Sequence, residues 1–217
     1  MLTEKEKFNI YMKLLLEWNE KINLTAITEP SEIMTKHFLD SLTCIQSGFI
    51  NDGASLVDVG TGAGFPGIPI KIERGDVKLT LMDSLNKRIN FLKEVSSELS
   101  LNANCVHIRV EDAGNDVKYR EKFDVAVSRA VANLSTLSEY CLPLVKVGGV
   151  MLAMKGKEID EELDNAKPLI KLLGGEVAEV QLHTIDGTDI THSIVVIKKV
   201  SNTPKKYPRN GKKVGTV

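Results

Sequence analysis

The segment Asp58-Val59-Gly60-Thr61-Gly62-Ala63-Gly64-Phe65-Pro66-Gly67 is the most informative part of this 217-residue sequence. It begins inside a short apolar run, residues 56–59, and continues into closely spaced glycines. Glycine lets the backbone turn sharply and approach a ligand without a Cβ in the way. Pro66 and Pro69 suit the first turn of a helix, where amide hydrogens lack partners within the helix. The segment therefore predicts a strand, a ligand-binding turn and a helix whose first amides can hold an anion or a polar cofactor edge.

Two functional patterns and one structural pattern compete for this turn. Gly62-Ala63-Gly64-Phe65-Pro66-Gly67 matches the GxGxxG fingerprint of dinucleotide-binding folds, and Asp83 follows about twenty residues on, where those folds place their ribose-binding acid. The pattern Asp-x-Gly-x-Gly-x-Gly, which starts at Asp58, is typical of S-adenosylmethionine-dependent methyltransferases. A carboxylate at Asp58 would repel a pyrophosphate and attract the ammonium group of a methionine. The methyltransferase hypothesis therefore leads, with a dehydrogenase and a purely structural glycine turn as alternatives.

The chain from residue 55 onward alternates between predicted strands and helices. Such alternation predicts a mostly parallel sheet with helices on both faces. No helix is predicted between the last two strands, so we expect them to form an antiparallel hairpin at one edge. The predicted strands span residues 56–59, 77–82, 105–110, 123–127, 150–154, 176–182 and 193–200, and the predicted helices span residues 86–99, 131–145 and 158–173. The expected fold class is α/β, a seven-stranded class I methyltransferase sheet with an antiparallel terminal hairpin.

Two amphipathic helices are predicted before this sheet. Residues 3–18 open with Thr3 and Glu6 at the spacing of a capping box, and apolar residues recur at helical intervals. A second helix is expected at residues 31–45, where His37 is interpreted as a core or local hydrogen-bonding residue. We therefore divide the chain into an N-terminal helical cap (1–50), a Rossmann-like methyltransferase domain (51–200) and a C-terminal tail (201–217).

The composition excludes several classes of protein. Hydrophobic residues make up 42% of the chain and 28 Lys and Arg face 29 Asp and Glu, which is ordinary for a globular protein. Three widely spaced cysteines do not suit a disulfide scaffold or a zinc site. The chain has neither a signal-peptide pattern nor an apolar run of about 20 residues, so we expect a cytoplasmic protein without a membrane partner.

Charge is distributed unevenly along the chain. No acidic residue follows Asp189, whereas seven basic residues do, so the tail is basic and the remainder is acidic. Such an asymmetry predicts contact with a polyanion near the C-terminus, and a solvated, irregular end is the alternative. The seven residues are Lys198, Lys199, Lys205, Lys206, Arg209, Lys212 and Lys213.

Acidic residues follow the second and third predicted strands. A carboxylate at Asp83, where the second strand ends, can accept hydrogen bonds from both hydroxyls of a ribose; an ordinary helix N-cap is the alternative. Val110 and Glu111 follow the third strand, where an apolar side chain and an amide would hold an adenine. The alternative is that the acidic residues of this segment are ordinary loop residues.

The chain also lacks motifs that would activate an acceptor. The segment after the fourth strand has no Asn/Asp-Pro-Pro-aromatic turn, which amino-group methyltransferases of bases carry. Cys141 lies inside a predicted helix and is interpreted as a core residue rather than a nucleophile. An acceptor that is already nucleophilic remains, and N7 of guanine fits because its lone pair is free at neutral pH. Catalysis would then be mainly alignment, with no catalytic side chain and no metal.

Several segments together resemble the bacterial 16S ribosomal RNA guanine-N7 methyltransferases, also called the glucose-inhibited division protein B family. The resemblance covers essentially the whole chain, and its segments occur in the family's order. They are the glycine turn extended to Ile68-Pro69, Asp83-Ser84-Leu85-Asn86-Lys87-Arg88, Ser128-Arg129-Ala130-Val131-Ala132, Ala153-Met154-Lys155-Gly156, Thr203-Pro204-Lys205-Lys206-Tyr207-Pro208-Arg209, Trp18-Asn19, Asn23-Leu24-Thr25 and His37-Phe38-Leu39-Asp40-Ser41-Leu42.

The resemblance implies transfer of a methyl group from S-adenosylmethionine to N7 of one guanine in 16S ribosomal RNA, either naked or in an assembling small subunit. No obligate protein partner is implied. Phe65 is expected to act as a lid over the cofactor, and Arg129 to pair with the donor carboxylate or with guanine O6. The implied cofactor-binding residues are Gly60, Phe65, Asp83, Val110, Glu111 and Arg129, and those implied to contact RNA phosphates are Lys87, Lys155, Lys205, Lys206 and Arg209.

Overall fold

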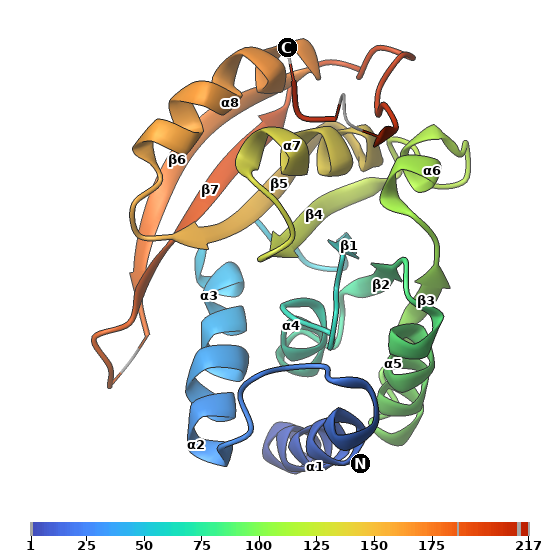
Figure 1. Ribbon diagram of the computed structural model, residues 1–217, viewed down its shortest axis with the longest axis vertical. Coiled ribbons are helices and arrows are strands. Elements are labelled where there is room, and N and C mark those ends of the chain that lie inside the picture. The colour runs from blue at the N-terminus through green and yellow to red at the C-terminus, as the bar shows by residue number, and fades with distance from the viewer. Residues whose placement is uncertain (1, 186, 212–213, 217) are drawn as a thin grey trace.

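The computed structural model describes residues 2–185, 187–211 and 214–216. Seven strands form one sheet in the order β3-β2-β1-β4-β5-β7-β6 (Figure 1). The strands β1 to β5 are parallel, and β7 runs antiparallel to both β5 and β6. The predicted parallel sheet with an antiparallel terminal hairpin is confirmed. The strands are β1 (Ser55–Val59), β2 (Lys78–Asp83), β3 (Asn104–His107), β4 (Phe123–Arg129), β5 (Val145–Gly156), β6 (Gly175–Thr184) and β7 (Thr191–Lys199).

Helices cover both faces of the sheet (Figure 1). One hydrophobic cluster joins the sheet to α1, η1, α3, α4 and α5, and a second joins it to α6, α7 and α8. The helices are α1 (Glu4–Ile22), α2 (Pro30–Ile33), the π-helix η1 (Met34–Leu39), α3 (Asp40–Gln46), α4 (Gly67–Glu73), α5 (Asn86–Glu98), α6 (Val110–Asn115), α7 (Leu134–Cys141), the 3₁₀-helix η2 (Leu142–Leu144) and α8 (Asp160–Leu172).

The central strands are buried on both sides. Leu56 of β1 belongs to the first cluster, and its neighbour Val57 to the second. Strands covered by helices on both faces read as continuous apolar runs, which is why residues 56–59 are legible as a strand. The carboxyl ends of the parallel strands meet at one edge, where ligands bind in open α/β sheets.

The N-terminal helices share the core of the sheet. Phe8 and Leu15 of α1 lie in the same buried cluster as residues of β1 and β2. Thr3 forms the predicted capping box with Glu6 at the start of α1. The second predicted helix, residues 31–45, is instead a continuous α2-η1-α3 segment with a π-helical middle. The boundary predicted near residue 50 therefore does not separate two hydrophobic cores.

Three predicted element ends are wrong in ways that affect the site. The third strand ends at His107, and Val110 begins α6 rather than ending a strand. The fourth strand continues to Arg129. The helix predicted at residues 131–145 begins only at Leu134, because residues 130–133 form a loop in which Ala130 has a φ of 56°. Each difference arises at the ligand edge of the sheet, where local hydrophobic periodicity is weakest.

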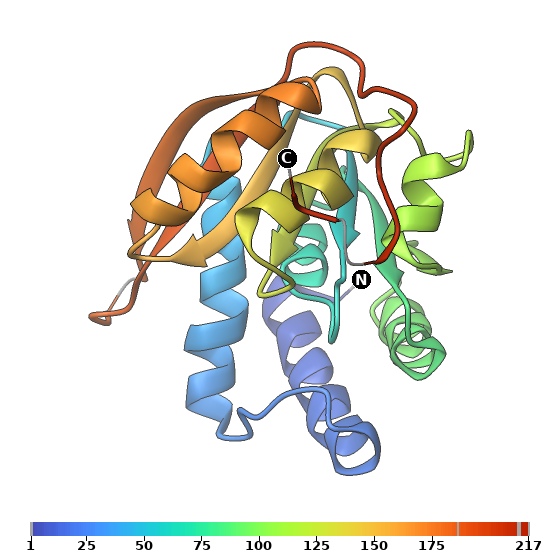
Figure 2. The ribbon, with the colours of Figure 1, turned by 45° about the horizontal axis from the view of Figure 1, so that its top comes forward.

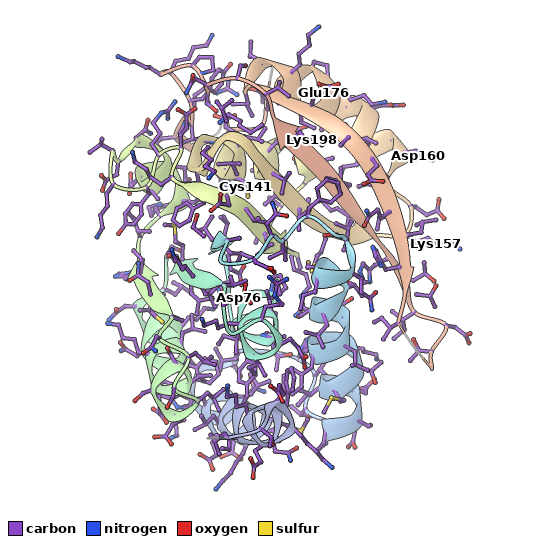
Figure 3. All side chains as sticks on the ribbon, turned by 180° about the vertical axis from the view of Figure 1, so that it is seen from behind. Asp76, Cys141, Lys157, Asp160, Glu176 and Lys198 are labelled. Atoms are coloured by element: carbon purple, nitrogen blue, oxygen red, sulfur yellow. The ribbon has the colours of Figure 1, made fainter. Side chains whose placement is uncertain are left out.

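The three cysteines are free, and Cys141 is fully buried on α7 (Figure 3), as a core residue should be. Across residues 2–185, 187–211 and 214–216, no helix is both long enough and apolar enough to cross a membrane.

A single hydrogen bond joins α1 to the glycine turn. The buried hydroxyl of Tyr11 donates to the carbonyl oxygen of Ala63. We expect Tyr11→Phe to lower the free energy of unfolding by about 1–3 kcal/mol, because this carbonyl would stay buried without its partner. Urea denaturation followed by circular dichroism measures the change, and a midpoint equal to that of the wild type would contradict it.

Candidate functional site

Asp58 stabilises the glycine turn through hydrogen bonds. This residue is fully buried at the end of β1, and its Oδ2 accepts hydrogen bonds from Thr61 Oγ1 at 2.7 Å and from the Gly67 amide at 2.8 Å. Burial raises the pKa of Asp58 to about 6, although these two hydrogen bonds favour the charged form. Its Oδ1 is buried and has no hydrogen-bond partner among the described residues. Asp58 thus fixes both ends of the turn and keeps one carboxylate oxygen unpaired.

Two glycines in the turn cannot be replaced without a clash. Gly60 has a φ of +65°, and a Cβ there would lie 2.7 Å from Val131 Cγ2. Gly64 has a φ of +100°, and its Cβ would lie 2.5 Å from Ile68 Cδ1. Residues with a side chain rarely adopt these conformations. Both positions therefore require glycine for backbone conformation and for space.

Asp83 lies across the turn from Asp58, at the end of β2. Its Oδ2 accepts from the Gly62 amide at 3.0 Å and lies 3.3 Å from Nη1 of Arg88. Its Oδ1 accepts from the Leu85 amide at 2.9 Å. The carboxylate is only 4% exposed, and it lines a cavity. Asp83 is therefore an ordered acceptor next to the turn rather than the N-cap of α5, which is Leu85.

A cavity of about 190 Å³ opens at this edge of the sheet, beside β1, β2 and α6. Val131 lines it and lies against Gly60. Tyr140 of α7 enters the cavity from the other side; its burial, followed by the charge of Glu111, raises the pKa of its hydroxyl. No sequence motif indicated Tyr140. The cavity is lined by Val59, Gly60, Met82, Asp83, Ser84, Ile108, Arg109, Val110, Glu111, Val131 and Tyr140.

A larger cavity, of about 480 Å³, lies at the opposite edge of the sheet. It is lined by residues at the start of β1, β4 and β5, including Ala54 and Asp124, and by Lys198 at the end of β7. Ligands in open α/β sheets bind outside the carboxyl ends of the strands, so the smaller cavity is the better candidate.

Phe65 is not at the cavity. It is 5% exposed and packs in an aromatic cluster, with ring centroids 4.6 Å from His37, 5.5 Å from Tyr11 and 6.0 Å from Phe38. In this conformation Phe65 does not cover the cavity, and its role as a lid over a cofactor stays a prediction. The apolar side chain after the glycines instead anchors the N-terminal helices to the turn.

Arg129 lies between the turn and those helices. Its guanidinium stacks over Phe65 at 4.9 Å, and Nη1 donates to Asp40 Oδ2 at 2.7 Å and to the Lys36 carbonyl at 3.0 Å. Asp40 and His37 were part of the motif that carries the family resemblance, but no sequence pattern placed them beside Arg129. The three come together because α3 packs against the sheet.

Two of the predicted RNA-contacting cations face inward. Lys155 donates to the Ala132 carbonyl at 2.7 Å and to Glu162 Oε1 at 2.6 Å, with its side chain 12% exposed, so it fixes the loop that carries Val131. Arg209 pairs with fully buried Glu139 of α7. Both groups have internal partners in this structure, and their contacts with RNA phosphates stay predictions. Lys87, Lys205 and Lys206 are exposed.

The C-terminal tail is irregular, as predicted, but it is packed on the body rather than solvated. It passes over α6 and α7 (Figure 2). Arg120 donates to the carbonyls of Tyr207 and Thr203, and Asn115 of α6 donates to that of Pro208. The tail therefore braces the helix that carries Val110 and Glu111. Lys212 and Lys213 lie outside the described residues.

The sheet order, the glycine turn after β1 and the acid after β2 define the fold of class I S-adenosylmethionine-dependent methyltransferases. Two solved structures share it. A SAM-dependent methyltransferase from Aquifex aeolicus has a TM-score of 0.54, with 18% identity over 78% of this chain and 93% of that one. TYW2 of M. jannaschii, solved in complex with AdoMet, has a TM-score of 0.55, with 14% identity over 75% and 77%. At such identities the likeness shows the fold alone.

Sequence comparison identifies the family. The model of the family described as rRNA small subunit methyltransferase G matches residues 4–190. The ribosomal RNA small subunit methyltransferase G of Alkaliphilus metalliredigens is 56% identical over 92% of this chain and 84% of its own length. The protein of the same name from Thermoanaerobacter sp. is 54% identical over 94% and 85%. The chain belongs to the rRNA small subunit methyltransferase G family.

Within the described part of the chain, no group of three or more His, Cys, Asp or Glu side chains is placed to hold a metal ion.

The Arg209–Glu139 pair gives the tail a measurable contribution to stability. Burial opposes ionisation of Glu139, but the hydrogen bonds from Arg209 and the Gly215 amide outweigh it and lower the pKa of the carboxyl. We expect Arg209→Met to cost about 3 kcal/mol of unfolding free energy at pH 7, because Glu139 remains buried without its cation. Thermal and urea denaturation measure this, with Lys205→Met as an exposed control in the same segment.

The same pair predicts a pH dependence. Because the folded pKa of Glu139 lies below its ordinary value of 4.5, the pair stabilises the fold fully above that pH and loses its contribution as the pH falls through the folded pKa. The difference between wild type and Arg209→Met should therefore shrink below about pH 4.5. A difference that stays constant down to pH 3 would argue against the pair.

Proposed function

We propose that this chain transfers a methyl group from S-adenosylmethionine to N7 of a specific guanine in 16S ribosomal RNA. One observation carries the proposal: in a chain of the rRNA small subunit methyltransferase G family, a cavity at the ligand edge of the sheet joins Gly60, Asp83 and Glu111. The proposed substrate is the RNA itself or an assembling small subunit.

The residues at this cavity suit the parts of the donor. Asp83 presents an ordered carboxylate that can accept from ribose hydroxyls, and Val110 with Glu111 opens α6 where an adenine would lie. Gly60 would let the donor approach the backbone. The unpaired Oδ1 of Asp58 is the kind of buried acceptor that a nearby ammonium group satisfies. Entry of the whole donor would require Val131 to move off Gly60, because the cavity is smaller than the roughly 300 Å³ of typical ligand sites.

The chemistry of the proposed acceptor determines what the protein has to supply. The donor supplies an electrophilic methyl group on a sulfonium, and guanine N7 has a free lone pair at neutral pH. The protein therefore has to align the two in line and exclude water, without a general base. Cys141 and Cys44 are fully buried, and burial raises the pKa of both thiols, so neither suits a covalent mechanism.

We further propose that three segments of the chain have separate roles. Residues 51–200 would carry the donor site, and residues 1–50 would support it through the aromatic cluster around Phe65. Residues 201–217 would brace α6 and present Lys205 and Lys206 to RNA phosphates, together with Lys87 of α5. Arg129 would stand beside the reacting groups as a ligand of the donor carboxylate or of guanine O6.

Donor binding tests the role of Asp83. We expect Asp83→Ala to weaken S-adenosylmethionine binding about 100-fold in calorimetric titration, because two hydrogen bonds to a charged acceptor are lost. The matched control is Asp76→Ala, an ion-paired carboxylate in the turn before β2, away from the cavity (Figure 3). Equal affinities of the two variants, or wild-type binding of NAD in place of the donor, would reject the proposal.

RNA affinity at several salt concentrations tests the exposed cations. We expect Lys87→Ala to weaken binding of a 16S fragment and to lower the slope of log affinity against log salt by about 1, because one phosphate contact disappears. Lys13→Ala on α1, whose side chain is 77% exposed, is the control. An unchanged slope at Lys87 would remove it from the RNA interface.

A further inference from the structure

Several partners fix the position of the Arg129 side chain. Besides Asp40, the Lys36 carbonyl and the face of Phe65, its Nη2 lies 3.2 Å from Nδ1 of His37. The same Nδ1 lies 3.1 Å from the Lys36 carbonyl, and Nε2 of His37 lies 2.8 Å from Thr25 Oγ1. Burial, and then the charge of Arg129, lowers the pKa of His37 to about 4, so the ring beside Arg129 is neutral at pH 7.

Asp40 connects Arg129 to a residue from the far end of the chain. Its Oδ2 accepts from Arg129, and its Oδ1 lies 2.9 Å from Nδ1 of His192 on β7, a distance that suits an ion pair but without the geometry of a hydrogen bond. The other ring nitrogen of His192 lies 2.9 Å from Thr43 Oγ1, also on α3. Burial opposes ionisation of Asp40, but His192 and Arg129 outweigh it and lower the pKa of the carboxyl.

The series Arg129–Asp40–His192 is largely shielded from solvent. The side chains are 17%, 13% and 10% exposed. Its members come from β4, α3 and β7, which pack around the ligand edge of the sheet. The Asp40 carboxylate faces Arg129 with one oxygen and His192 with the other. The guanidinium of Arg129 therefore has little freedom to rotate, because rotation would leave the largely buried carboxylate without its cation. Surface ion pairs do not impose such an orientation.

We infer that Asp40 and His192 are positioning residues for Arg129, and that they hold its guanidinium at the point where donor and guanine meet. The inference rests on the proposed methyl transfer. Neither residue is expected to touch donor or RNA. Their effect on the reaction should therefore pass through Arg129 alone.

A double-mutant cycle tests this. Methylation of 16S RNA is followed with tritiated S-adenosylmethionine for wild type, Asp40→Asn, Arg129→Ala and the double variant. We expect each single variant to lower kcat/KM about 100-fold, as misplacement of an aligning group does. The double variant should be no slower than Arg129→Ala, because Asp40 has nothing to position once the guanidinium is gone.

Two further comparisons separate positioning from stability. His192→Asn keeps a polar side chain beside Asp40 and should retain more kcat/KM than His192→Leu, even where both unfold at the same temperature. Asp124→Asn removes a carboxylate that bonds Ser55 and Lys146 at the opposite edge of the sheet, and its effect should multiply with that of Arg129→Ala. Thermal unfolding of each variant confirms that it is folded.

The outcomes are distinct. An inactive wild type that binds no S-adenosylmethionine would reject the proposed function itself. An active wild type with an unaffected Asp40→Asn variant, or with losses at Asp40 and Arg129 that multiply, would overturn the positioning role. Equal kcat/KM values for His192→Asn and His192→Leu would remove His192 from it.

Discussion

The carboxylate of Asp58 is the constraint on which the ligand edge of this sheet depends. A buried carboxylate is costly unless it accepts hydrogen bonds, and Asp58 takes them from Thr61 and from the Gly67 amide. These two donors lie at the two ends of the glycine turn. The strand end, the turn and the start of α4 are therefore one unit, and Asp83 closes it from the neighbouring strand through the Gly62 amide.

The N-terminal helices complete this unit from outside. Tyr11 donates to Ala63 within the turn, and Phe65 enters the aromatic cluster that the helices provide. Arg129 then joins the end of β4 to α3. The N-terminal helices therefore contact the turn at Ala63 and at Phe65. This packing explains why their hydrophobic residues belong to the core of the sheet. A mutation in α1 or α3 can therefore alter the ligand edge without lying in it.

Much of this architecture was predictable from the sequence, because buried strands and amphipathic helices have local periodicities. The sheet with its terminal hairpin, the turn and the position of Asp83 all followed from such patterns. The internal partners of Phe65, Lys155 and Arg209 were not predictable, because residue type shows what a side chain can contact but only the packing shows which way it faces. Tyr140 and His192 lay outside any motif, and the fold alone brings them to Glu111 and Asp40.

The basic residues near the C-terminus likewise show that sequence does not indicate which way a side chain faces. The seven basic residues after Asp189 suggested a polyanion-binding tail, yet the fold uses two of them internally. Lys199 is fully enclosed, where it donates to Thr203 Oγ1 at 2.8 Å and to the Val145 carbonyl at 3.1 Å, and Arg209 neutralises Glu139. A phosphate competes only for cations that are not already paired, so the electrostatic footprint of the described tail reduces to its exposed lysines. Net charge by segment therefore overestimates what the tail offers to RNA, and Arg209, through Glu139, stabilises the helix α7 that contributes Tyr140 to the proposed donor site.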